Sequence, residues 1–65
     1  MYTKIITIEK KNAPLLDDIL NLADKNTYKR LSSNKIMVDY DDDWIIEQLG
    51  RNNIQIISNI FSYDK

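Results

Sequence analysis

Five acidic residues stand within a stretch of nine in the second half of the chain: Asp39, Asp41, Asp42, Asp43 and Glu47. Carboxylates at this density can cap a helix, bind a hard cation or meet a basic surface. Three of the aspartates match the first ligand positions of an EF-hand loop, but Trp44 and Gly50 stand where that loop needs glycine and glutamate. An EF-hand is therefore excluded. A solvated helix cap, a looser magnesium or calcium site and an acidic patch for a basic partner remain as interpretations.

The chain lacks the residue types on which most catalytic sites depend. It has no histidine and no cysteine, and Gly50 is its only glycine. Without histidine, none of the serines and threonines has the usual base to activate it. Without a glycine-rich loop, the phosphate-binding and dinucleotide-binding motifs are excluded. We therefore predict a protein that is not an enzyme, with no cofactor, no metal and no disulfide.

Charge divides the chain into two halves. Residues 36–65 hold six acidic and two basic side chains, whereas residues 1–35 hold seven basic and four acidic ones. The basic residues are scattered over several expected elements and form no stripe, so we expect no direct nucleic-acid binding. We predict that the acidic half contacts a partner protein with a basic surface. The main contact is expected at the aspartates of residues 39–43 and at Glu47.

Hydrophobic patterning predicts the elements that position these residues. Residues 2–9 alternate and are rich in β-branched types, which predicts a strand. Residues 13–25 carry an apolar stripe at helical spacing and have Pro14 in the first turn, which predicts a helix. Residues 28–31 and 35–40 are expected to pair as a hairpin around a Ser-Asn turn. An alternative interpretation extends the helix to residue 31 and removes the hairpin.

The second half predicts a short helix and a last strand. One of the three aspartates at 41–43 is expected to cap a helix that begins at Trp44. Gly50 is expected to supply the left-handed residue at its end. Residues 54–61 predict the final strand. We expect Trp44 to be a core anchor between this helix and the sheet.

The element order is therefore β-α-β-β-α-β, the split βαβ of the ferredoxin-like fold. Right-handed crossovers place both helices on one face of a four-stranded antiparallel sheet, giving an α+β sandwich. The alternative interpretation gives β-α-β-α-β with one long first helix. Sixty-five residues allow one domain, which we take as 1–65.

The sheet is expected to have apolar side chains on its uncovered face. Strict alternation in the last strand puts Ile57 and Phe61 on the face opposite Ile56 and Ile60. Together with Ile5 of the first strand, Ile57 and Phe61 should form a patch on the face without helices. We predict that this face or the last strand forms a homodimer or binds a partner.

These features favour a small, non-enzymatic, protein-binding module in the cytoplasm. The longest apolar runs are three residues, far short of the roughly 20 that span a bilayer. Isoleucine, asparagine and lysine make up 25 of the 65 residues, which indicates an AT-rich gene. The hypothesis that follows is an inhibitor from a phage or mobile element, with its acidic run in the nucleic-acid-binding groove of a host enzyme.

An alternative function shares the expected element order. ACT-like domains are dimeric regulatory modules that bind small ligands and have the same β-α-β-β-α-β order. They usually carry glycine between the first strand and the first helix, whereas residues 10–14 contain none. This difference favours the protein-binding hypothesis.

Overall fold

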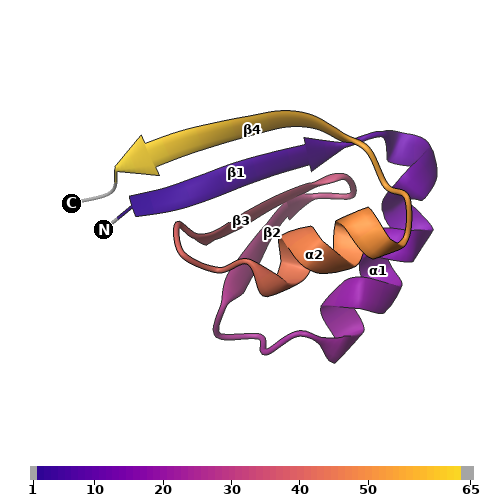
Figure 1. Cartoon of the computed structure of the whole chain (residues 1–65), viewed down its shortest axis with the longest axis horizontal. Helices are drawn as coiled ribbons and strands as arrows, with labels where there is room; N and C mark the ends of the chain where they lie inside the picture. Colours follow the sequence, from indigo (N-terminus) through magenta and orange to yellow (C-terminus); the bar gives the residue numbers. More distant parts are fainter. Residues whose placement is uncertain (1, 64–65) are drawn as a thin grey trace.

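The computed structural model describes residues 2–63, and its elements follow the expected β-α-β-β-α-β order (Figure 1). The strands are β1 (Tyr2–Ile8), β2 (Tyr28–Ser32), β3 (Lys35–Asp39) and β4 (Ile56–Tyr63), and the helices are α1 (Ala13–Leu22) and α2 (Trp44–Arg51). The strands form one sheet in the order β2-β3-β1-β4, with every neighbouring pair antiparallel. The predicted ferredoxin-like sandwich is confirmed.

The segment between α1 and β2 explains why the hairpin forms and why the first helix does not extend to residue 31. α1 ends three residues before the predicted boundary, because Ala23 is already extended (ψ 153°). Asp24 then organises a turn: its carbonyl accepts from the Thr27 hydroxyl at 2.7 Å, and its carboxylate accepts from the Asn26 amide at 2.9 Å. These bonds stop the helix and redirect the chain into β2.

Both helices cover the same face of the sheet, and the core lies between them and the strands (Figure 1). Nine of the ten buried apolar residues lie in β1, α1, β3 and α2, and the tenth, Ile54, lies in the segment between α2 and β4: Ile6, Ile8, Leu16, Ile19, Leu20, Ile36, Val38, Ile45, Leu49 and Ile54. Tyr28 of β2 and Ile56 of β4 pack against this core and are half-buried. Over residues 2–63, neither helix is long and apolar enough to cross a membrane.

An extra residue in β4 breaks the alternation that the sequence suggests. Ile56 and Ser58 each have a partner on β1, whereas Ile57 between them has none. Ile57 therefore forms a β-bulge, in which the side chain is 60% exposed. Beyond the bulge, every residue of β4 points to the opposite face from the one that strict alternation predicts.

This shift corrects the predicted composition of the uncovered face. Opposed residues of antiparallel strands share a face. Phe61 is opposite Lys4, so it lies on the helix side, and the prediction that it faces away from the helices is wrong. Ile60, opposite Ile5, takes its place. Ile5 lies on the uncovered face as predicted, in one row with Ile60 and Met37.

The end of α2 also differs from the prediction. The helix continues through Gly50 to Arg51, and Asn53 is the left-handed residue, with φ 57°. The Asn53 amide donates to the Gly50 carbonyl at 3.1 Å, and the Ile54 amide donates to the Leu49 carbonyl at 2.9 Å. This pair of bonds is a Schellman motif, which buries Ile54 against Leu49.

We predict opposite effects for alanine at these two positions. A Cβ at Gly50 would have nothing within 4 Å, so Gly50→Ala should raise the free energy of unfolding by about 0.5–1 kcal/mol. Asn53→Ala puts a Cβ into the left-handed region and should lower it by about 1–2 kcal/mol. Urea unfolding of both variants checks this. A loss of stability in Gly50→Ala would contradict the observed helix end.

Candidate functional site

The acidic loop is attached to the sheet by a buried lysine. Lys4 of β1 is 5% exposed and lies on the helix side of the sheet. Its Nζ donates to the Asp42 carbonyl at 3.3 Å and lies 3.7 Å from the Asp43 carboxylate. The ring of Tyr40 stands 5.8 Å from the same nitrogen. One ammonium group thus holds most of the segment between β3 and α2.

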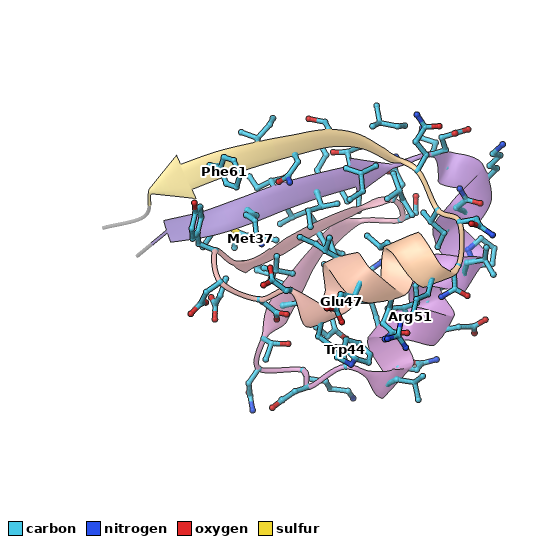
Figure 2. The ribbon with its side chains drawn as sticks, viewed as in Figure 1. Met37, Trp44, Glu47, Arg51 and Phe61 are labelled. Atoms are coloured by element: carbon cyan, nitrogen blue, oxygen red, sulfur yellow. The ribbon has the colours of Figure 1, made fainter. Side chains whose placement is uncertain are left out.

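An aromatic pair continues this contact towards the edge of the sheet. The rings of Tyr40 and Phe61 have centroids 5.3 Å apart and are tilted by 55°. Phe61 lies near the end of β4, beyond the reach of α2 (Figure 2). It is therefore 58% exposed although it points to the helix side.

The structure gives internal roles to two of the five predicted acidic residues. A carboxylate oxygen of Asp42 accepts from the Trp44 amide at 3.1 Å and so fixes the start of α2. Asp43 occupies the N-cap position, but its side chain makes no capping bond and pairs with Lys4 instead. The expected aspartate at the start of α2 is present, with the roles divided between Asp42 and Asp43.

The other three acidic residues do not share one surface. Asp39 is opposite Thr3 in the register and so lies towards the uncovered face. Asp41 is exposed in the turn after β3, and Glu47 is exposed on the outer side of α2 near Trp44 (Figure 2). Within residues 2–63, no three carboxylates gather as a group that could hold a metal ion.

Trp44 is not the core anchor that the sequence suggested. Its side chain is 41% exposed, and α2 buries Ile45 and Leu49 instead. Consecutive helical residues point about 100° apart, so burying Ile45 turns Trp44 towards the side of the helix. There the indole faces the C-terminal end of α1.

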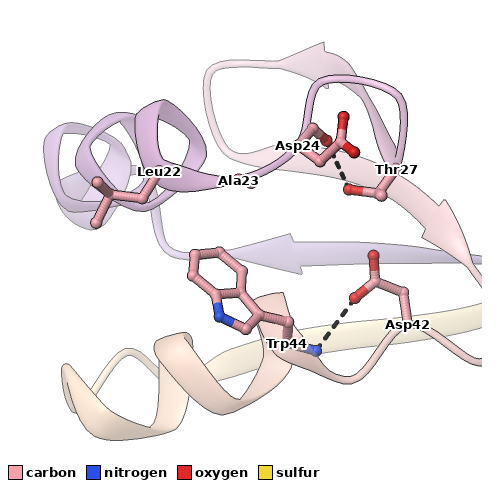
Figure 3. A pocket seen from close by; sticks show the side chains of 6 residues that line it. All are labelled: Leu22, Ala23, Asp24, Thr27, Asp42 and Trp44. Carbon is pink, nitrogen blue, oxygen red and sulfur yellow. Dashed lines mark hydrogen bonds between the residues drawn. The ribbon is translucent and has the colours of Figure 1, made fainter.

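Two hollows of about 480 and 270 Å³ are lined by residues of both helices and share Leu22 in their walls. Trp44 lines the larger one. We call the two hollows together the seam groove, and the residues that line it are Leu15, Asp18, Ile19, Leu22, Ala23, Asp24, Thr27, Asp42, Trp44, Gln48 and Asn52. In the larger hollow, the indole of Trp44 lies between Leu22 and the two carboxylates of Asp24 and Asp42 (Figure 3).

The lining of the seam groove is apolar and acidic. Leu15, Leu22 and Trp44 are 42%, 79% and 41% exposed, so three large apolar side chains contact water in one place. Three aspartates line the groove, and none of the lysines and arginines within residues 2–63 does. Such a surface suits a ligand with an apolar stem and a positive head.

Comparisons of the chain with protein-family models, with curated proteins and with solved structures find no match. We therefore infer the function from the seam groove and its charges. The sequence pattern selects neither Asp18 nor Asp24, and the apolar stripe predicted over residues 13–25 does not separate Leu15 and Leu22 from the buried residues. The positions of the two leucines on the helix were the available signal: Leu15 and Leu22 lie about 90–110° from the centre of the buried stripe.

We predict that reversing the charge of Lys4 leaves a large fraction of the molecules unfolded. Lys4→Glu places a carboxylate in a buried position beside Asp43 and a backbone carbonyl, which should cost about 3–5 kcal/mol. That cost is comparable to the total stability of about 3–5 kcal/mol expected for so small a core. The matched control is Lys35→Glu at an exposed position of β3, which should change stability by less than about 0.5 kcal/mol. Similar circular dichroism melting curves for the two variants would contradict the role of Lys4.

Proposed function

We propose that the protein is a non-enzymatic binding module that receives a basic, partly apolar segment of a partner protein in the seam groove. The observation that carries this proposal is the lining of the groove, where exposed Leu15, Leu22 and Trp44 stand beside three aspartates. Among residues 2–63, no lysine or arginine contributes to this lining. A partner with lysine or arginine on an apolar surface complements both properties at once.

The geometry of the larger hollow supports recognition of an arginine or lysine side chain. The aliphatic stem would pack on Leu22 and the indole, and the positive head would reach Asp24 and Asp42. Each of these two carboxylates uses only one oxygen in a hydrogen bond within the described part of the chain. The second oxygen of each can accept from a guanidinium or ammonium group. A cation over the face of the indole adds about 0.5–2 kcal/mol.

The exposed acidic residues outside the groove support the approach of such a partner. Asp41 and Glu47 are exposed beside Asp42 and Trp44, on either side of the start of α2. Charges of this kind act mainly on the rate of association and are screened by salt. The acidic patch of the sequence analysis thus keeps a supporting role in the proposal, and Asp43 contributes by holding the loop in place.

A narrower role follows from the chemistry of the partner. Basic segments with apolar contacts are also those with which proteins hold nucleic-acid phosphates. A module that covers such a segment would inhibit a nucleic-acid-handling enzyme. The AT-rich composition supports a phage or mobile element as the source of the protein. The host cytoplasm would then be its place of action. The acidic groove favours this hypothesis over the ACT-like alternative.

The seam groove can be tested with a peptide and the protein's own fluorescence. Trp44 is the only tryptophan, so its emission reports on the groove directly. The probe is an amphipathic helical peptide with arginine on one face and leucine on the other, and the control peptide carries glutamate in place of arginine. We expect the arginine peptide to change the emission and to bind more weakly as salt rises, and the glutamate peptide to have no effect.

Two double variants with the same change in net charge distinguish binding of the peptide in the groove from its attraction by the net charge of the protein. Asp18→Asn with Asp24→Asn alters the groove, whereas Asp39→Asn with Asp41→Asn alters only the strand end and the turn. The groove variant should bind the arginine peptide about tenfold more weakly or worse. The other variant should lose less than about threefold at physiological salt. Equal losses would mean that net charge alone attracts the peptide, and the proposed site would be wrong.

A further inference from the structure

The two edges of the sheet differ in how they are protected from pairing. At one edge, β2 has five residues, includes Lys29 and Arg30, and is interrupted by a register shift between Arg30 and Ser32. The guanidinium of Arg30 pairs with Asp17 of α1 and donates to the Ser33 carbonyl at 2.8 Å. Charge, short length and irregularity are the usual means by which an edge strand avoids pairing with another chain.

The opposite edge has few of these protections. β4 has eight residues and no charged residue, proline or glycine among them. In the part of the chain that the structure describes, no other strand lies on its outer side (Figure 1). Ile57, Ile60 and Phe61 are each more than half exposed. The bulge at Ile57 disturbs only the first part of the strand, and residues 58–63 pair regularly with β1.

The alternation beyond the bulge determines how this strand can pair with itself. Residues 59 and 61 point to the helix side, and residues 58 and 60 point to the uncovered side. Opposed residues of an antiparallel pair must share a face, so a symmetric pair of β4 strands has one residue opposite its own copy. Two centres keep the paired residues within the regular run 58–63. A centre at Ile60 sets Asn59 against Phe61. A centre at Phe61 sets the two phenylalanines against each other, although each ring already contacts Tyr40, so Ile60 is the better axis. Centred on Asn59, it would set Phe61 against the bulged Ile57.

We infer that β4 pairs antiparallel with β4 of a second copy of this chain, with the two-fold axis at Ile60. A second copy is the fitting occupant because the edge is uncharged: it meets itself without repulsion and offers no counter-charge to an acidic or basic strand. The axis runs perpendicular to the sheet, so both helix layers lie on the same side. The two seam grooves of the dimer therefore open to the same side. This dimer does not depend on the proposed function of the groove.

A single cysteine at the axis tests the pairing, because the natural chain has none. In Ile60→Cys, the two Cα atoms would lie about 4.5–5.5 Å apart, within the range of a disulfide. In the control Ile57→Cys, the cysteine is equally exposed, but the two copies would be separated by roughly 20 Å along the strands. Under mild oxidation we expect Ile60→Cys to form a covalent dimer and Ile57→Cys to remain monomeric.

The same variants separate edge pairing from packing of the two uncovered faces. Sheets that pack face to face lie about 10 Å apart, too far for a disulfide between two residues at position 60. Sedimentation of the wild-type chain from micromolar to millimolar concentration should show a monomer that becomes a dimer, and Ile60→Lys should abolish the dimer. A wild-type monomer at millimolar concentration, or equal cross-linking of the two cysteine variants, would overturn the inference.

Discussion

The buried ammonium of Lys4 is the interaction on which the acidic end of the molecule depends. A charge without water needs partners close by, since an unpaired buried charge costs several kcal/mol. Lys4 finds them in the carbonyl of Asp42 and the carboxylate of Asp43, which stand next to each other in the chain. The loop must therefore lie against β1. Asp42 is then in place to begin α2, and Trp44 follows at the mouth of the seam groove.

The lengths of the elements explain why a loop, and not a helix, supplies the partners of Lys4. α2 has eight residues and is about 12 Å long, whereas β1 and β4 extend over about twice that distance. The helices thus cover one part of the sheet and leave uncovered the end at which β1 begins and β4 finishes (Figure 1). Lys4 and Phe61 belong to these parts of the two strands. An apolar side chain at position 4 would also be protected from water there, but it would bind neither the carbonyl nor the carboxylate of the loop.

Local patterns were sufficient to predict the elements and their order. Alternation over residues 2–9 predicted the first strand and placed Ile5 on the uncovered face, and helical spacing predicted the first helix. The hairpin followed from the two short segments at 28–31 and 35–40 and the Ser-Asn turn between them. These signals depend on neighbours within a few positions, and such neighbours act in the same way whatever the rest of the chain does.

The features that the sequence did not reveal depend on contacts between distant segments. The bulge at Ile57 inserts one unpaired residue into the pairing of β4 with β1. The alternation of apolar and polar residues along β4 does not show where such a residue is inserted. Gly50 looked like a helix end, yet the Schellman motif formed three residues later, at Asn53, because Ile54 could then join the core. Trp44 was expected in the core because it begins a short helix with few other apolar residues, but the burial of Ile45 leaves it at the side of the helix. The seam groove depends on all of these placements.

The role of Lys4 can be tested most directly by hydrogen exchange in Lys4→Met. Methionine preserves the apolar packing of the stem and removes only the charge, so the fold should be retained. The amides of Asp42 and Trp44, which are bonded within the loop, should exchange about tenfold faster or more, because the loop opens without its tether. The core amides of Ile6 and Ile36 should exchange at nearly the wild-type rate. Unchanged protection at Asp42 and Trp44 would contradict the claim that Lys4 holds the acidic loop in place.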